Sequence, residues 1–263
     1  MHELTLSRGG RLCNFVESIR LLTPGSSGVE RLVGLPGAQV QLLVRRRDSD
    51  SSGVDAYVIG PRSRVTRKAI VNRHPALAVR FRPGAARIFI GVPLCELSDQ
   101  VLPIEELWGD DGVRMREAIA GTYDLGVQVH VLEHALLARV PRGYSSGDTS
   151  THTVRRAVRL LEHARDFPTV TSLARQLGIS ERGLRRAFND AAGIAPKTYL
   201  RILRFRSALR VAQASATPRW SDVALDAGYY DQAHMIDEFR DFVAATPTTL
   251  LKEIADDPQS STR

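Results

Sequence analysis

Apolar and polar residues alternate in two different ways along this chain. Between residues 30 and 82, apolar residues recur at every second position, as in the series Val40, Leu42, Val44 and the series Leu77, Val79, Phe81. A period of two is typical of a strand that buries one face. Pro-Gly pairs at 36–37 and 83–84 provide turns between such strands. The pattern therefore predicts a β-rich fold for this part of the chain.

Helical spacing replaces this alternation further along. Residues 112–120 and 124–139 are expected to form helices, the second with Val131, Leu132 and Leu136 at helical spacing. A polar stretch rich in glycine and serine follows at 141–152 and is the expected domain linker. From Val154 to about Leu251, the pattern predicts a succession of short helices.

This helical part contains an internal repeat. Five positions of the first copy correspond to five positions fifty residues later. The first copy has Val170, Leu173, Ala174, Leu177 and Gly178, and the second has Trp220, Val223, Ala224, Ala227 and Gly228. After the glycine the offset becomes fifty-one: Ser180, Leu184, Phe188 and Pro196 recur as Asp231, Met235, Phe239 and Pro247. An amphipathic helix, a glycine turn and a capped second helix form the helix-turn-helix pattern. A plain helical bundle is the alternative, and two copies in register argue against it.

A longer helix is expected between the two units. Pro196 opens it, and it reaches about Ala214, which makes it roughly 28 Å long at 1.5 Å per residue. Such a rod could hold two recognition helices about one DNA turn, roughly 34 Å, apart.

The residues at these positions resemble the AraC/XylS family of bacterial transcription regulators over residues 153–252. The resemblance is carried by Leu173-Ala174, Gly178-Ile179-Ser180, Leu184 to Phe188, Gly193-Ile194-Ala195-Pro196, Tyr199-Leu200, Ala224, Gly228-Tyr229, Phe239 and Thr246-Pro247. It implies a DNA-binding domain of two helix-turn-helix units joined by the long helix, preceded by a sensing or dimerising domain.

The first part of the chain resembles an N-terminal domain that recurs in the same family. The matching residues are Arg80 to Ala85, Gly91-Val92-Pro93, Glu96-Leu97 and Leu107-Trp108-Gly109. By analogy, this domain is expected to be a small β-barrel with a helical appendage, and a ligand there rests on fold-level analogy alone.

The expected fold class is therefore α+β, in four parts. Residues 1–140 form a β-rich, barrel-like sensing or dimerisation domain with two C-terminal helices, and 141–152 form the linker. Residues 153–252 form the all-α AraC-type DNA-binding domain, and 253–263 form a flexible tail.

Two residues of the second unit depart from the family pattern. Ala244 stands where glycine is usual and where the first unit has Gly193, and a left-handed conformation there would cost alanine about 1 kcal/mol. Arg219, before the first helix of the second unit, is a poor N-cap, whereas Thr169 serves the first unit. We therefore expect the second unit to be the less stable one.

The residues expected to meet DNA lie on the outer faces of the two recognition helices. In the first, Arg182, Arg185 and Arg186 match the family's base- and phosphate-contacting positions, with Asn189 beside them; Arg can bond guanine bidentately, and Asn adenine. In the second, the outward residues are Gln232, Ala233, Ile236, Asp237 and Arg240. Since Ala233, Ile236 and Asp237 replace the three arginines, the first unit is expected to supply most of the affinity.

Charge and composition agree with this picture. Residues 153–252 hold 16 Lys/Arg against 10 Asp/Glu, an excess expected of a domain that meets phosphates, although a GC-rich genome would also enrich arginine. No apolar run approaches the roughly 20 residues of a membrane span, and residues 1–10 lack the apolar core of a signal peptide. With only Cys13 and Cys95, a cytoplasmic location is expected.

Enzyme interpretations find little support. His130, Glu133 and His134 spell an inverted zinc-protease signature, but no third ligand motif accompanies it, so neither a metal nor a cofactor is expected. Cys95 has no neighbouring His or Arg to activate a thiolate, and a buried, inert cysteine is expected.

The leading hypothesis is thus a sequence-specific DNA-binding transcription regulator, modulated by a small-molecule or protein effector at the N-terminal domain. An effector-independent dimeric regulator, with the helices at 112–139 forming the homodimer, is the alternative, and an enzyme fused to a DNA-binding domain is the third. Expected partners are promoter or operator double-stranded DNA and, on the same promoter, RNA polymerase.

Overall fold

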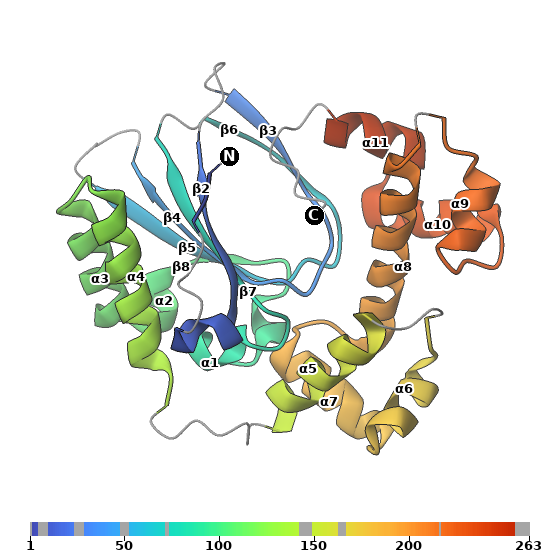
Figure 1. Ribbon diagram of the computed structural model, residues 1–263, viewed down its shortest axis with the longest axis horizontal. Coiled ribbons are helices and arrows are strands. Elements are labelled where there is room, and N and C mark those ends of the chain that lie inside the picture. The colour runs from blue at the N-terminus through green and yellow to red at the C-terminus, as the bar shows by residue number, and fades with distance from the viewer. Residues whose placement is uncertain are drawn as a thin grey trace.

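The computed structural model describes residues 2–4, 10–23, 29–47, 53–71, 74–141, 149–162, 167–215 and 217–255. The strands gather on one side of the molecule, and the helices from α5 onward gather on the other (Figure 1). The expected α+β class is confirmed, with a β-rich N-terminal domain and an all-α C-terminal domain.

The N-terminal domain is built on a six-stranded antiparallel sheet and a two-stranded ribbon. The sheet has the order β1-β2-β7-β4-β5-β8, and the ribbon pairs β3 with β6. The strands are β1 (His2–Leu4), β2 (Val16–Leu22), β3 (Val29–Gly34), β4 (Gln41–Arg46), β5 (Val54–Ile59), β6 (Thr66–Val71), β7 (Ala76–Phe81) and β8 (Val101–Pro103). The ribbon curves away from the sheet toward the helical domain, which gives the barrel-like outline (Figure 1).

The expected alternation of buried residues holds for β4 but not for β7. In β4, Leu42 and Val44 are buried and their neighbours are half-buried. In β7 all six residues are buried, including Ala78 and Arg80, which were expected on an exposed face. This strand lies between β2 and β4 in the sheet, and the ribbon lies across a cavity from its second face, so both faces are largely shielded from solvent.

Short helices cover the other face of the sheet. They are α1 (Ala86–Ile90), α2 (Ile104–Trp108), α3 (Asp110–Ala120) and α4 (Leu125–Arg139), with 3-10 turns η1 (Arg11–Asn14) and η2 (Leu94–Leu97). The helices expected at 112–120 and 124–139 are confirmed as α3 and α4. Leu132 and Leu136 of α4 belong to the same apolar core as Leu42 of the sheet.

The C-terminal domain consists of seven helices among the described residues. They are α5 (Thr149–Glu162), α6 (Val170–Leu177), α7 (Glu181–Ala191), α8 (Pro196–Gln213), α9 (Trp220–Asp226), α10 (Gln232–Val243) and α11 (Pro247–Ala255). The long connecting helix expected from Pro196 is confirmed as α8, whose 18 residues span about 27 Å. It stands as a column with one helix-turn-helix unit at each end (Figure 1).

The ends of the expected segments differ in detail. Helix α5 begins at Thr149, so the last four residues of the expected linker are helical, and residues 142–148 lie outside the described part. Residues 253–255, expected in a flexible tail, complete α11, and residues 256–263 are not described.

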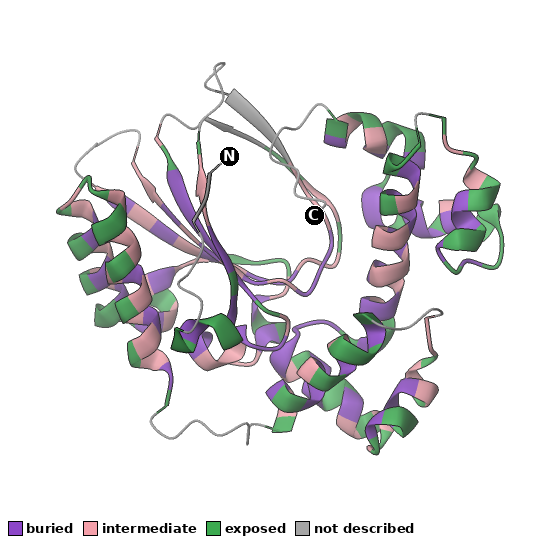
Figure 2. Cartoon of the chain, viewed as in Figure 1, coloured by how far each residue is buried: buried purple, intermediate pink, exposed green. Residues whose placement is uncertain are grey.

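The two domains pack closely against each other. Ala38, from the N-terminal domain, is buried within the core cluster of the helical domain, and Val33, Leu35 and Val65 pack against that cluster. Buried and half-buried residues occur on both domains where they face each other (Figure 2). The position of the helix-turn-helix units is therefore set in part by the N-terminal domain.

Candidate nucleic-acid interface

The first recognition helix, α7, is fixed by its own sequence. The Ser180 hydroxyl accepts a hydrogen bond from the Gly183 N–H at 3.1 Å, which satisfies one of the unpaired donors at the helix start. Leu184 and Phe188, at helical spacing, are fully buried in the domain core. One face of α7 therefore packs in the core, and its opposite face is exposed to solvent.

That opposite face carries the four expected residues of the first unit. Arg182, Arg185, Arg186 and Asn189 are all exposed, and their spacing of three and four residues places them on one side of the helix. Arg185 lies 3.5 Å from the Glu181 carboxylate, with 67% of its side chain exposed. Exposed guanidinium groups on one side of a capped helix can reach base edges or phosphates.

The second recognition helix, α10, repeats this plan with different chemistry. The Asp231 carboxylate caps it by accepting from the His234 N–H at 2.7 Å, and Met235 and Phe239 are fully buried. Exposed on the outside are Gln232, Ala233, Asp237 and Arg240, while Ile236 is half-buried. Asp237 pairs with Arg240 at 3.3 Å, so a carboxylate faces outward where the first unit has an arginine.

The expected weak boundaries of the second unit are confirmed. Thr169 caps α6 by accepting from the Ser172 N–H at 3.1 Å, whereas Arg219 makes no side-chain cap at α9 and pairs with Asp222 instead. Ala244 ends α10 in the left-handed region, with φ of 52°. The change of offset from fifty to fifty-one corresponds to a second turn that is one residue longer: the cap of α7 follows Gly178 by two residues, and the cap of α10 follows Gly228 by three.

A buried ion-pair cluster in the second unit was not foreseen. Glu238 is 5% exposed and receives Arg201 Nε at 2.8 Å and Arg204 Nη2 at 3.3 Å, both from α8. Burial, and next the Glu238 carboxylate, raise the pKa of Tyr229. The repeat offset of fifty-one aligns Glu238 with Ala187, which is buried in the first unit. This alignment was the signal in the sequence that the Glu238 side chain would be buried.

The two units differ in net charge as well. Residues 169–195 hold four arginines against two acidic residues, whereas residues 219–246 hold two arginines against six acidic residues. DNA attracts the first unit by its charge and repels the second.

The N-terminal domain contacts the C-terminal end of each recognition helix. At α7, Arg87 Nε lies 2.6 Å from the Asp190 carboxylate, and the Ser98 hydroxyl donates to the Gly193 carbonyl. A Cβ on Gly193 would lie 2.5 Å from Pro61 Cγ, so this glycine also permits the domains to approach closely. These contacts join residues about a hundred positions apart, and sequence patterns gave no sign of them.

At α10, the N-terminal domain takes the role of a helix cap. The Val65 N–H donates to the Phe242 carbonyl oxygen at 2.8 Å, and Arg67 Nη1 donates to the Val243 carbonyl oxygen at 2.9 Å. Arg67 Nε also pairs with Glu253 of α11 at 2.8 Å. The last carbonyls of a helix have no partner within it, and here the ribbon end supplies two donors.

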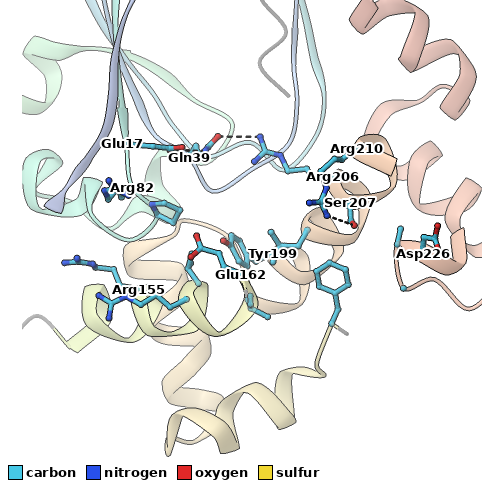
Figure 3. Close-up of a pocket in the computed structure, with 18 of the residues that line it drawn as sticks. Glu17, Gln39, Arg82, Arg155, Glu162, Tyr199, Arg206, Ser207, Arg210 and Asp226 are labelled. Atoms are coloured by element: carbon cyan, nitrogen blue, oxygen red, sulfur yellow. Dashed lines mark hydrogen bonds between the residues drawn. The ribbon is translucent and has the colours of Figure 1, made fainter. Parts of the chain in front are cut away.

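A cleft of about 880 Å³ lies between the two domains (Figure 3). Side chains of both signs line it, including Arg155 and Glu162 of α5, Arg206 and Arg210 of α8, and Glu17 of β2. Five arginines and three acidic residues line it among the described residues, so its charge is mixed with a basic excess.

Little points to catalysis in the residues described. No group of three His, Cys, Asp or Glu side chains among them could hold a metal ion, and His130 and His134 are exposed on α4. Cys95 is exposed in η2, so the expectation that it is buried was wrong; the chain turns there with Leu94 and Leu97 inward. None of the described helices is long and apolar enough to cross a membrane.

Comparison with known proteins covers both parts of the chain. Residues 173–253 match the family model of a helix-turn-helix domain, and residues 11–103 match that of a domain of unknown function (DUF6597). No curated protein matches the chain.

Several solved structures are similar. A transcriptional regulator with an AraC-type DNA-binding domain from Chromobacterium violaceum is 25% identical, over 40% of this chain and 95% of that one, with a TM-score of 0.36. The DNA-binding domain of AdpA, solved with a target DNA, is 26% identical, over 43% of this chain and 100% of that one, with a TM-score of 0.36. ToxT from Vibrio cholerae is 8% identical, over 90% of this chain and 98% of that one, with a TM-score of 0.43.

The C-terminal domain thus has two capped helix-turn-helix units on a connecting helix, and most of it matches the helix-turn-helix model. Residues 173–253 are therefore a helix-turn-helix domain, and the function that this domain supports is that of a DNA-binding transcription regulator.

Proposed function

We propose that this regulator recognises its operator chiefly through the first helix-turn-helix unit. Arg182, Arg185 and Arg186 read bases or phosphates in the major groove, and Asn189 lies beside them. The observation that carries this proposal is the side-by-side exposure of three arginines on a capped helix whose other face is buried. A bidentate Arg–guanine pair discriminates against a wrong base by about 1–3 kcal/mol.

The second unit has a supporting role in this proposal. Gln232 and Arg240 contact a base or the phosphate backbone, Ala233 lies against the groove, and Asp237 limits affinity unless it accepts from a cytosine amino group. The Arg240–Asp237 pair supports this role, because it partly neutralises the guanidinium that DNA would otherwise attract.

The remaining parts of the chain are assigned in the same proposal. Residues 1–140 form the sensing domain, which an effector modulates, 141–152 the linker and 153–252 the DNA-binding domain. The contacts of Arg87 and Arg67 with the two units support a sensing role, since any movement of the N-terminal domain displaces both recognition helices. The protein acts in the cytoplasm on promoter DNA, where RNA polymerase is the partner through which transcription changes.

A homodimer without an effector is the second candidate. It is supported by Tyr123, two residues before α4, and by Val127 in its first turn, which are 76% and 48% exposed. Most other apolar residues of α4 pack within the domain core, which weakens this candidate. Sedimentation of the full chain at tens of micromolar decides it: a strict monomer excludes the dimer.

Genome-wide mapping of bound sites, followed by titration of the recovered operator, tests the main proposal. Replacing Arg182, Arg185 and Arg186 together with alanine should abolish specific binding. Arg175→Ala, which removes an exposed arginine from α6 of the same unit, is the control and should bind the operator with little change. Operator affinity that survives in the triple variant would refute the proposal.

A further inference from the structure

One arginine of the first recognition helix is linked by a carboxylate to the other helix of its unit. Arg185 Nη2 lies 3.5 Å from Oε2 of Glu181, one helical turn earlier on α7. The other carboxylate oxygen of Glu181 accepts a hydrogen bond from the Thr171 hydroxyl at 2.6 Å. Thr171 belongs to α6. The Thr171–Glu181–Arg185 chain of contacts therefore runs from the first helix of the unit to the outer face of the second.

The Glu181 carboxylate is held in place independently of the arginine. Glu181 is the first residue of α7 after the Ser180 cap, where the helix dipole favours a negative charge. An exposed ion pair alone is weak, because two long side chains must be held in one geometry. Here the short Thr171 side chain fixes one partner with a charge-assisted hydrogen bond, so less order is lost when the arginine joins it.

The other two arginines on this face have no such support. Among the described residues, neither Arg182 nor Arg186 forms an ion pair with a carboxylate. Asp190 lies one turn after Arg186, but it pairs with Arg87 of the N-terminal domain at 2.6 Å. The three arginines therefore differ in their surroundings, although all three are exposed on one side of the same helix.

The second unit does not repeat the Thr171–Glu181–Arg185 chain. The repeat offsets of fifty and fifty-one align its three members with Ser221, Gln232 and Ile236. The Ser221 hydroxyl donates to Asp222 Oδ1 at 3.1 Å, within its own helix. Since neither a carboxylate nor an arginine occupies the aligned positions on α10, the arrangement belongs to the first unit.

We propose that Glu181 and Thr171 are positioning residues that orient Arg185 to read one guanine of the operator. This inference rests on the proposed function of the first unit. A guanidinium has five N–H donors, so the contact of Arg185 Nη2 with Glu181 leaves enough of them for guanine O6 and N7. A guanidinium that is already restricted loses less side-chain entropy when it pairs with a base. The carboxylate also repels phosphates, so it favours discrimination between bases at the expense of non-specific affinity.

Titration of the recovered operator, with each base pair replaced in turn, tests the positioning role in the full chain. Arg185→Ala identifies the base pair at which discrimination depends on Arg185. Bidentate reading favours guanine over a wrong base by roughly 5- to 150-fold. At that base pair, Glu181→Gln and Thr171→Val should each lower the discrimination by roughly three- to tenfold, which is part of this factor. Thr171→Ser keeps the hydroxyl and should retain the discrimination.

Affinity for non-specific duplex separates positioning from damage to the fold. Glu181→Gln removes a negative charge near the phosphates, so non-specific binding should tighten while the discrimination falls. A damaged unit would weaken both. Thr171 is exposed and Glu181 half-buried, so both variants are expected to fold. Ser221→Ala, which removes the aligned hydroxyl from the second unit, is the matched control and should leave the discrimination at this base pair unchanged.

A double-mutant cycle shows whether Glu181 acts through Arg185. In the Arg185→Ala background, Glu181→Gln should change the discrimination no further. A further loss would mean that Glu181 itself accepts from a base, such as a cytosine amino group, and would overturn the inference. It would also be overturned if Arg185→Ala kept its discrimination at every base pair, or if Glu181→Gln and Thr171→Val both kept theirs. Operator affinity that survives the loss of Arg182, Arg185 and Arg186 together would instead refute the proposed function.

Discussion

The two helix-turn-helix units stand at opposite ends of α8, and each has a capped recognition helix with one buried face. The side chains on the two recognition helices differ. On the first helix, arginines face outward and Ala187 is buried, and on the second, Asp237 faces outward and Glu238 is buried. In the second unit, an exposed carboxylate and a buried ion-pair cluster occupy the positions at which the first unit has an exposed arginine and a buried alanine. The difference teaches that a conserved backbone plan does not carry its function with it, because function depends on which side chains face the groove.

The N-terminal domain is attached to the two units in different ways. It holds the first through a side-chain pair, Arg87 with Asp190, and through close packing at Gly193. It holds the second through donors to helix carbonyls at Phe242 and Val243. The N-terminal domain therefore contacts the C-terminal end of both recognition helices, but it does so with different groups.

Glu238→Ala should have the largest effect on stability. It leaves Arg201 and Arg204 without the carboxylate that they share, and breaking a buried ion pair costs about 3–5 kcal/mol. The lower end is expected, since both arginines keep some exposure to water. Urea unfolding measures the change. Glu238→Gln, which removes the charge but keeps the size and one acceptor oxygen, is the matched control and should lose less, and no loss at all in this variant would mean that the charge is unimportant.

Arg219→Ser should strengthen the second unit by about 1 kcal/mol. Serine supplies the N-cap that α9 lacks, and the surface pair with Asp222 that is lost contributes little. Thr169→Ala in the first unit should cost a similar amount, because it removes an existing cap. Thermal unfolding of both variants provides the comparison, and no gain from Arg219→Ser would show that the start of α9 is satisfied in another way.

Ala244→Gly should stabilise the protein by up to about 1 kcal/mol. Glycine adopts the left-handed φ of 52° without the steric penalty of a Cβ, although it also makes the unfolded chain more flexible. The reciprocal change, Gly193→Ala, should destabilise the first unit, since the added Cβ would meet Pro61 and Leu94. If Ala244→Gly lowered the midpoint of urea unfolding, strain at this position would be absent.

Asp237→Ala should have the smallest effect, a mild tightening of non-specific DNA binding. It removes an exposed negative charge from the recognition helix and frees Arg240 from its pair. Glu106→Ala, at an exposed position in the N-terminal domain, gives the same change in net charge and is the control. Titration of non-specific duplex at two salt concentrations measures both. A loss of specific operator binding in Asp237→Ala alone would identify Asp237 as a base reader.

Local signals in the sequence predicted the helical domain well. The spacing of apolar residues and the caps Thr169, Ser180 and Asp231 gave the helix starts, and the left-handed Ala244 followed from its place in the repeat. These features depend on residues within a turn or two of one another, so the sequence alone contains the information.

Contacts between distant segments could not be predicted in this way. The burial of Arg80 depends on the ribbon that covers β7, and the pairs Arg87–Asp190 and Arg201–Glu238 depend on the packing of separate elements. A single sequence shows the residue types but not which of them the fold brings together. The burial of Arg80 and the attachment of the N-terminal domain could therefore be seen only in the structure.

The central claim, that the first unit reads the operator, is tested most directly by titrating one operator with three single variants. Arg185→Ala and Arg186→Ala should each weaken specific binding by about 1–3 kcal/mol, and Gln232→Ala, on the second recognition helix, should weaken it less. A base-reading arginine should relax specificity at one position, and a phosphate-contacting one should weaken all sequences and reduce the salt slope. Wild-type affinity in both arginine variants, together with a loss of binding in Gln232→Ala, would contradict the account.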